Sequence, residues 1–272
     1  MSVLLVVATM APTASANTAQ LTKTVQAQMK GVQATIAVRD LDTNTLVYGY
    51  NQNLALAPAS NMKLLTAAAA LHHLGTDYEM TTDLYIDGTI EGNTLNGNVY
   101  VRGEGDPTFQ ADDFITFANA LKAKGITQIN GHFYGDESWF TGPRLAPGIG
   151  RTDELQYYGA QISALTMSPN NDYDASTMIV SATGSSVGKA PTLTYMPNSS
   201  GMNIVNQAKT VAKGKANTLS IKRQYNTNRI IVSGSIPVGA TKREWMTLYS
   251  PTLNTLVAMK QAWETQGVTF IK

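Results

Sequence analysis

Pro58-Ala59-Ser60-Asn61-Met62-Lys63-Leu64-Leu65-Thr66, continued by the apolar run 67–74, is the stretch from which the fold is best approached. Proline ends the preceding extended segment because its ring fixes φ and removes a hydrogen-bond donor. Serine is favoured at a helix start, and glycine, here Gly75, is typical of a helix end. The stretch therefore predicts a helix that begins at Ser60 and ends at Leu74.

Ser60 and Lys63 are three residues apart, so a helix places both on one face. Apolar residues surround this helix on every side, which predicts that it is buried. A serine hydroxyl becomes a strong nucleophile when a base takes its proton, and burial adapts a lysine to that role by lowering its pKa. The helix start also offers the Ser60 N–H as one oxyanion donor. This arrangement predicts acyl transfer through a serine ester.

A second Ser-x-x-Lys pattern, Ser186-Val187-Gly188-Lys189, serves as an internal control. It lies among Gly184, Ser185, Ala190 and Pro191, which are residues typical of turns. No helix is expected there, so the spacing alone predicts no chemistry at this copy.

Composition excludes several functions for the 272-residue chain. The formal charge of +1 gives no electrostatic signature for nucleic acid or an anionic membrane surface. There is no cysteine, and the three histidines lack metal-ligand spacing, so we expect neither a metal nor a cofactor. Gly103-Glu104-Gly105 lacks the third glycine of a dinucleotide fingerprint. His72 and His73 are expected to have a structural role at the end of the Ser60 helix.

The N-terminus resembles an export signal. Apolar residues 3–10 are followed by Ala14-Ser15-Ala16, which fits the small-residue cleavage pattern, although no basic residue precedes Val3. We expect residues 1–16 to be the remnant of a signal peptide on an exported, extracytoplasmic protein; a simple disordered or helical terminus is the alternative. No segment is long enough to predict an integral membrane span.

The pattern along the chain predicts an α+β protein. Residues 18–29 have helical periodicity, and 33–39 and 45–50 read as a hairpin. From residue 76 the sequence is rich in Thr, Asn, Gly and Ser, which favours short strands in inserted domains. The strands expected there are 82–86, 98–102, 128–134, 160–167, 177–182, 218–223 and 229–235.

Two segments have the same order of elements, a helix, a glycine stop and a β-branched run. They are 114–133, with Gly125 at the stop, and 253–271, with Gly267. Internal duplication and a common αβ connection explain this similarity equally well.

Several motifs carry a resemblance to a known family. In chain order they are Pro58 to Thr66, Val101-Arg102-Gly103-Glu104-Gly105-Asp106-Pro107-Thr108, Gly135-Asp136-Glu137-Ser138-Trp139-Phe140, Leu145-Ala146-Pro147-Gly148, and Leu155-Gln156-Tyr157-Tyr158-Gly159-Ala160 with Ser163-Ala164-Leu165. Over residues 18–272 the chain resembles the D-alanyl-D-alanine carboxypeptidase/endopeptidase family, the class C low-molecular-mass penicillin-binding proteins (peptidase family S13).

The resemblance implies a partial penicillin-binding-protein/β-lactamase-like transpeptidase domain that carries large strand-rich inserts. Its expected domains are 17–75 for the first part of the catalytic domain, 76–245 for the inserts and 246–272 for a segment that leads back toward the catalytic domain. The substrates implied are peptidoglycan stem peptides, and β-lactam antibiotics are the implied covalent inhibitors. The sequence leaves the oligomeric state open.

The resemblance also assigns roles to three residues. Ser60 corresponds to the acylated nucleophile, and Lys63 to its base. Asp136 corresponds to an aspartate that meets the free amino group of the peptide's diamino acid; a turn-capping role for Asp136 is the alternative, because Gly-Asp is common in turns.

The family pattern also includes an S-x-N triad and a K-T-G strand. No K-T-G occurs, and Ser168-Pro169-Asn170, which matches S-x-N literally, is expected at a hairpin tip. We therefore expect a C-terminally truncated chain in which the Ser60 helix lacks its covering sheet. Such a chain is expected to be poorly soluble, or to be stably folded only in its insert. The alternatives are a non-catalytic muropeptide-binding module of the cell envelope and a serine β-lactamase.

Overall fold

The computed structural model describes residues 18–198 and 200–271, so the expected signal segment 1–16 lies outside the described residues. The chain forms two compact units that meet between Tyr78 and Glu79. This boundary lies three residues after the one expected at Gly75. None of the helices in the described residues is both long and apolar enough to cross a membrane.

The first unit contains the expected helix, hairpin and helix. Its elements are α1 (Thr18–Gln28), β1 (Ile36–Arg39), β2 (Leu46–Tyr50), the 3₁₀ turn η1 (Ala59–Asn61) and α2 (Met62–Leu74). β1 and β2 pair in antiparallel fashion, and the Asp40 carboxylate accepts the N–H of Thr43 at 2.8 Å in the turn between them. Gly75 ends α2 at φ +83°, where its N–H donates to Leu71.

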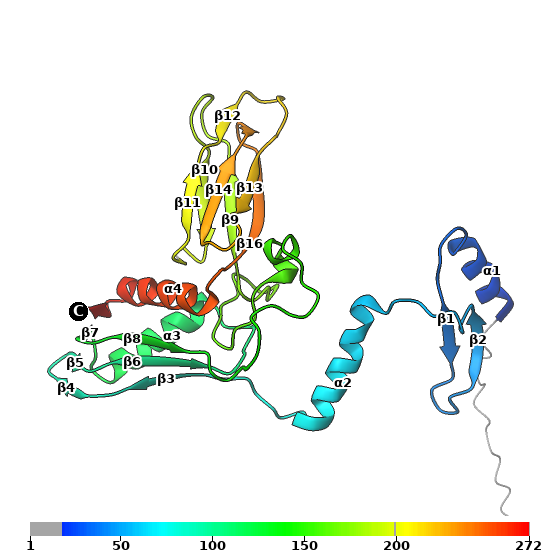
Figure 1. The fold of residues 1–272 in the computed structure, drawn as a ribbon, viewed down its shortest axis with the longest axis horizontal. Coiled ribbons are helices and arrows are strands. Elements are labelled where there is room, and N and C mark those ends of the chain that lie inside the picture. The colour runs from blue at the N-terminus through cyan, green and yellow to red at the C-terminus, as the bar shows by residue number, and fades with distance from the viewer. Residues whose placement is uncertain (1–17, 199, 272) are drawn as a thin grey trace, which may run out of the picture. The chain divides into compact units, whose positions relative to one another are not determined.

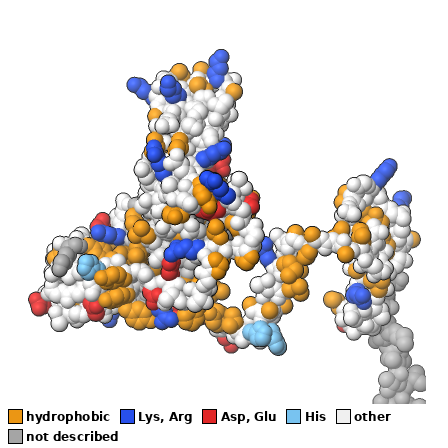
Figure 2. Space-filling model, in the orientation of Figure 1, with side chains coloured by type: hydrophobic (Ala, Val, Ile, Leu, Met, Phe, Trp, Pro, Cys, Tyr) orange, Lys and Arg blue, Asp and Glu red, His pale blue; other side chains and the backbone are white. Residues whose placement is uncertain are grey.

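The burial expected for α2 is wrong for the described residues. All residues of this helix are exposed, and Leu64 and Leu65 leave 73% and 64% of their surface accessible. Figure 2 shows hydrophobic side chains along α2. The apolar sequence forms the expected helix, but no described residue packs over its apolar side chains.

The second unit begins with two small sheets and two helices. One sheet has the order β3-β6-β8, and the other β17-β7-β5-β4. The strands are β3 (Thr82–Ile86), β4 (Thr89–Glu91), β5 (Thr94–Asn96), β6 (Val99–Gly103), β7 (Gln128–Ile129), β8 (Phe133–Asp136) and β17 (Thr269–Phe270); the helices are α3 (Ala111–Ala123) and α4 (Pro251–Thr265). The helices pack together (Figure 1), and the buried Trp263 donates its indole N–H to the Phe114 carbonyl at 2.9 Å.

The two similar sequence segments lie side by side in this unit. β17 and β7 are parallel neighbours, and their helices α4 and α3 are in contact. Both helices end at a glycine with φ near +80°, Gly125 at +81° and Gly267 at +83°. Residues 246–271 thus belong to the second unit, where α4 buries Met259 and Trp263 in the hydrophobic core. Duplication and a common connection both remain compatible with this geometry.

The rest of the second unit is a strand-rich lobe (Figure 1). Its three groups of strands have the orders β10-β9-β16, β11-β14-β13 and β12-β15. The strands are β9 (Thr177–Thr183), β10 (Thr192–Met196), β11 (Asn203–Asn206), β12 (Lys209–Val211), β13 (Ser220–Arg223), β14 (Arg229–Ser233), β15 (Ser235–Pro237) and β16 (Thr241–Thr247).

Three strand expectations need correction. Residues 128–134 and 229–235 each form two short strands, and Gly234 at φ +86° separates the second pair. Residues 160–167 form no strand, because their backbone bonds to loops: Ala164 accepts the N–H of Gly105 at 2.9 Å, and Ile162 donates to Arg144 at 2.7 Å. Two 3₁₀ turns, η2 (Asp153–Leu155) and η3 (Tyr157–Gly159), precede this segment.

Candidate functional site

Ser60 and Lys63 meet at the start of α2. Lys63 Nζ donates to Ser60 Oγ at 3.1 Å. Ser60 lies in the η1 turn, one residue before Asn61, which is the N-cap of α2. No side-chain hydrogen bond caps either helix start, so the Ser60 hydroxyl is directed to the lysine instead of the helix backbone. The pair places a hydroxyl within hydrogen-bond reach of an amine, an arrangement in which a lysine can act as base for a serine nucleophile.

The backbone immediately before Ser60 is strained. Ala59 has φ +45°, a left-handed conformation that costs a residue with a Cβ about 1–2 kcal/mol. Such strain is common at functional sites, although five other non-glycine residues of the described chain also have positive φ. The sequence contains no signal for this feature, since alanine does not favour positive φ.

Both side chains of the pair are exposed in the described chain. The apolar surroundings expected around Lys63 are therefore absent among the described residues. Ser60 and Lys63 belong to the first unit, whereas Asp136 belongs to the second.

Asp136 lies at the end of β8, where its Oδ1 accepts the N–H of Ser138 at 2.8 Å. Its neighbour across the parallel β6–β8 ladder is Arg102, whose Nε is 3.9 Å from Oδ2. Hydrogen bonds from Ser138, aided by the Arg102 charge, hold the pKa of the Asp136 carboxyl below its usual value. Asp136 is thus a turn-forming carboxylate that stays ionised, with one oxygen still facing a cation.

Three residues without a predicted role, Arg102, Trp139 and Glu104, lie around Asp136. The Arg102 guanidinium lies over the Trp139 ring, 5.3 Å from its centre, and Glu104 is 3.8 Å from the same guanidinium. A sequence signal for this cluster exists: Asp106-Pro107-Thr108 and Asp136-Glu137-Ser138 are two Asp-x-Ser/Thr turns. They follow β6 and β8, and parallel strands bring such ends to one edge of a sheet.

The second Ser-x-x-Lys copy lies in a turn, as expected. The S-x-N match does not lie at a hairpin tip, because residues 160–167 form no strand before it. Ser186 accepts the backbone N–H of Lys189 at 3.0 Å within a turn, and Gly188 has φ +82°. In the S-x-N match, Ser168 is buried and donates to the Pro107 carbonyl at 2.6 Å, while Asn170 bonds Asp172 in the following turn. Both copies therefore have structural roles in the second unit.

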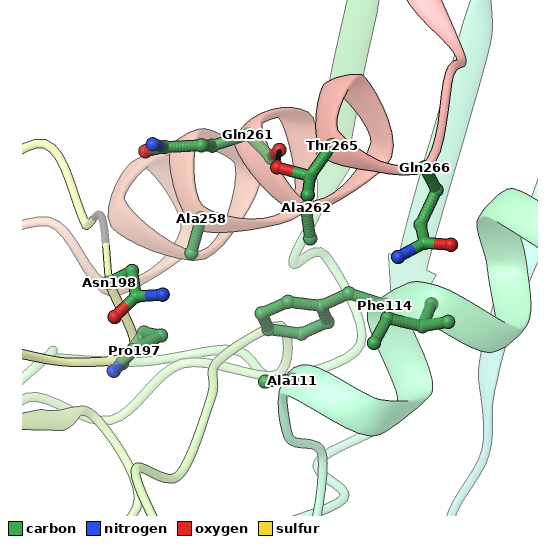
Figure 3. A pocket seen from close by; sticks show the side chains of 10 residues that line it. Ala111, Phe114, Pro197, Asn198, Ala258, Gln261, Ala262, Thr265 and Gln266 are labelled. Atoms are coloured by element: carbon green, nitrogen blue, oxygen red, sulfur yellow. Dashed lines mark hydrogen bonds between the residues drawn. The ribbon is translucent and has the colours of Figure 1, made fainter.

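A cavity of about 200 Å³ opens between α3 and α4 (Figure 3). Its walls are mostly apolar, with the Phe114 ring directed toward Ala258 and Ala262 of α4, and it contains no titratable side chain. It therefore offers no acid, base or nucleophile. In the described part of the chain, no group of three or more His, Cys, Asp or Glu residues could hold a metal ion.

Comparison with known proteins places this geometry in a family. The chain is 34% identical, over 242 residues, to the D-alanyl-D-alanine carboxypeptidase of Actinomadura sp. (strain R39); the match covers 89% of this chain and 45% of that protein. It is 31% identical over 112 residues to the D-alanyl-D-alanine carboxypeptidase DacB of Haemophilus influenzae, which covers 41% of this chain and 23% of the relative.

Solved structures agree on the fold. The crystal structure of penicillin binding protein 4 (dacB) from Haemophilus influenzae superposes with a TM-score of 0.67 at 19% identity, over 90% of this chain and 54% of that one. The same protein complexed with a novel β-lactam gives a TM-score of 0.60 at 18% identity, over 90% and 52%. The mixed α+β architecture is thus shared, and the chain spans about half the length of the relatives it matches.

The family profile itself covers nearly the whole chain. It is described as the D-Ala-D-Ala carboxypeptidase 3 (S13) family, and it matches residues 16–272. Together with the identity to the Actinomadura enzyme, this match shows that the chain belongs to the S13 family of D-Ala-D-Ala carboxypeptidases, which are serine peptidases and penicillin-binding proteins.

Proposed function

We propose that the protein is a serine-type D-alanyl-D-alanine carboxypeptidase/endopeptidase that acts on peptidoglycan stem peptides through an acyl-enzyme on Ser60. The observation that carries the proposal is the 3.1 Å hydrogen bond from Lys63 to Ser60 in a chain of this family. Ser60 Oγ attacks the carbonyl carbon of the scissile bond while Lys63 takes its proton. The C–N bond then breaks, the leaving amine receives the proton, and water hydrolyses the ester.

The same proposal gives each unit a part. α1, the β1–β2 hairpin and α2 form part of a transpeptidase-type catalytic domain, and residues 79–272 are inserted domains. The division between Tyr78 and Glu79 supports this assignment. The Ala14-Ser15-Ala16 pattern supports export from the cytoplasm.

Asp136 is proposed to bind the free amino group of the stem peptide's diamino acid. Its lowered pKa keeps the carboxylate negative, and Oδ2 has only the loose Arg102 contact at 3.9 Å. An ammonium group is a stronger partner for a carboxylate at hydrogen-bond distance than a guanidinium held at that range. β-Lactams are proposed as covalent inhibitors, in keeping with the β-lactam complex of the Haemophilus protein.

A second candidate is a non-catalytic module that binds muropeptides. It is favoured by the sequence given, which has no K-T-G, and by the structural role of Ser168 in the match Ser168-Pro169-Asn170. The two candidates differ in one measurable property: the peptidase cleaves stem peptides, whereas the binding module binds them without cleavage.

Release of D-alanine from a stem pentapeptide tests the proposal, using protein expressed from the complete reading frame. Ser60→Ala removes the nucleophile, so kcat is expected to fall more than about a thousandfold. Ser186→Ala is the matched control and should retain full activity. Activity that survives Ser60→Ala contradicts the proposal, and binding without any turnover in the unsubstituted protein favours the non-catalytic module.

A further inference from the structure

Two edge strands of the second unit line one cleft. β16 is the outer strand of the β10-β9-β16 sheet, and β13 is the outer strand of the β11-β14-β13 sheet. A cleft of about 590 Å³ lies between them and the η2–η3 segment 152–157, a size typical of ligand-binding clefts. An edge strand presents unpaired backbone N–H and C=O groups, so a cleft walled by two such edges is suited to an extended chain.

The register of β16 shows which groups face the cleft. At the ends of its ladder with β9, Gly184 donates to Ala240 and Leu248 donates to Ser176, each at 2.9 Å. Hydrogen-bonded residues alternate along an antiparallel ladder, so the even-numbered residues of β16 bond β9. Arg243 and Trp245 therefore direct their N–H and C=O groups outward. No described residue hydrogen-bonds these groups.

β13 also directs backbone groups that do not bond β14 toward this cleft. Its even-numbered residues bond β14, because Gln224 donates to Arg229 at 2.8 Å at one end of the ladder. The backbone N–H and C=O groups of the odd-numbered Leu219 and Ile221 therefore point away from β14. The Leu219 carbonyl accepts a hydrogen bond from Lys242 Nζ at 2.9 Å. At the far end, Arg223 Nε donates to Thr247 Oγ1 at 3.1 Å, which holds the two strands together and closes the cleft.

The charges of the cleft are unbalanced. Lys242 pairs with Glu244 at 3.1 Å, and the buried Arg223 pairs with Glu154 at 2.9 Å. Lys222 and Arg243 also line the cleft, are exposed, and have no acidic partner among the described residues. The cleft thus carries two uncompensated positive charges.

The wall between these charges is apolar and contains one hydrogen-bond donor without an acceptor among the described residues, the Trp245 indole N–H. Leu155, Tyr157 and Met246 line the cleft beside Trp245. The Trp245 indole Nε1 is buried and has no hydrogen-bond acceptor in the described chain. Buried donors are nearly always paired in native proteins, so an acceptor from outside the chain would complete this site.

We propose that this cleft binds an extended acidic segment of a partner protein, which adds a strand to the β16 edge through the backbone groups of Arg243 and Trp245. Strand addition uses backbone bonds for affinity and alternate side chains for specificity. Acidic side chains of the segment pair with Lys222 and Arg243. Charges on an edge strand also guard it against pairing with other copies. Here, however, the edge forms one wall of a cleft that also presents Lys222 and the unpaired Trp245 indole donor. The proposal is independent of chemistry at Ser60.

The test titrates the full 272-residue chain with an N-acetylated hexapeptide of alternating glutamate and valine, followed by amide NMR. We expect shifts at Ile221, Arg243 and Trp245. Arg243→Pro removes one outward N–H but no bond to β9, and should weaken binding about tenfold. Arg243→Gln keeps that N–H and should weaken binding about threefold, an effect that added salt reduces. Lys189→Gln removes an exposed charge outside the cleft and should change nothing.

Two further probes need no variant. The same hexapeptide with alternate backbone nitrogens methylated should fail to bind, because it cannot form the strand ladder. Polyphosphate, an anion without a peptide backbone, should not shift Arg243 and Trp245. Equal binding of the methylated peptide overturns the proposal, and equal binding of polyphosphate assigns the cleft to anionic polymers instead. Concentration-dependent dimerisation that shifts the same amides without peptide would also overturn it.

Discussion

At the scale of single residues, the pair Ser60 and Lys63 is set by the backbone as much as by sequence spacing. Ala59, just before Ser60, has a left-handed backbone, and the N-cap of α2 is Asn61, not Ser60. The Ser60 hydroxyl therefore makes no cap hydrogen bond and accepts one from Lys63 Nζ. A serine that capped the helix would lend its hydroxyl to the backbone and be a poorer acceptor for the lysine. The spacing predicted the contact, but it did not predict how the hydroxyl is kept available.

Asp136 provides a titration prediction at this scale. Removing the Ser138 hydroxyl by Ser138→Ala should raise the Asp136 pKa toward its usual value, because the largest stabiliser of the carboxylate is lost. The folded-state pKa of Asp136 is lowered. Its contribution to stability is therefore present above the usual aspartate pKa and is lost as pH falls through the folded value.

Carboxyl-carbon NMR titration of the unsubstituted chain and of Ser138→Ala measures this shift. Asp87 is the internal control, since its lowered pKa depends on Asn98 and should not move. An unchanged Asp136 pKa in the variant would contradict the assigned cause.

At the scale of elements, the buried pair Arg223–Glu154 joins β13, β16 and η2. The side chains are 0% and 2% exposed, and Arg223 also donates to Thr247 Oγ1 and to the Thr227 carbonyl at 3.0 Å. These contacts satisfy the guanidinium on three sides. The pair therefore fixes the two sheets against the η2–η3 segment, although neither residue carries a sequence motif for that role.

Glu154→Ala should lower the free energy of unfolding by about 3–5 kcal/mol, because it leaves a buried guanidinium without its counter-charge. Urea unfolding measures the change. The matched control is Glu264→Ala, which removes the exposed Lys260–Glu264 pair at 4.0 Å and should cost less than about 1 kcal/mol. An equal decrease in the free energy of unfolding for the two variants would contradict the prediction that the buried pair contributes more to stability than the exposed pair.

Most elements could be predicted from local patterns, and the failures have physical causes. The β1–β2 hairpin, α2 and β3 follow from turn residues and periodicity. The 160–167 segment has strand-like composition, but its backbone bonds loops that are distant in sequence, such as Gly105 and Arg144. The Arg102–Trp139 contact joins residues from separate segments, which spacing does not reveal. The contact between Ser60 and Lys63 could be predicted from the sequence, because both residues lie on one helical turn.

At the scale of the whole chain, the two units differ in how much apolar surface they bury. The hydrophobic core consists of residues of the second unit, from Leu95 to Val268, whereas no residue of α2 is buried. An uncovered helix opens locally at little cost in free energy, because few contacts are lost. An exposed apolar face also promotes aggregation. The poor solubility expected from the sequence thus remains a prediction with a structural basis.

Hydrogen exchange tests this difference. Amides of α2 should exchange at least about a hundredfold faster than those of α4 in the 272-residue chain. Leu64→Gln with Leu65→Gln should raise solubility without changing the unfolding midpoint of the second unit. Protection of α2 equal to that of α4 would contradict the account.

The central claim is that Ser60 forms the acyl-enzyme, and covalent labelling tests it most directly. Protein from the complete reading frame is incubated with a fluorescent penicillin, and the adduct is located by peptide mass spectrometry. The account predicts one adduct, on Ser60, which is absent in Ser60→Ala and unchanged in Ser186→Ala. An adduct on another residue, or labelling that persists in Ser60→Ala, would contradict it.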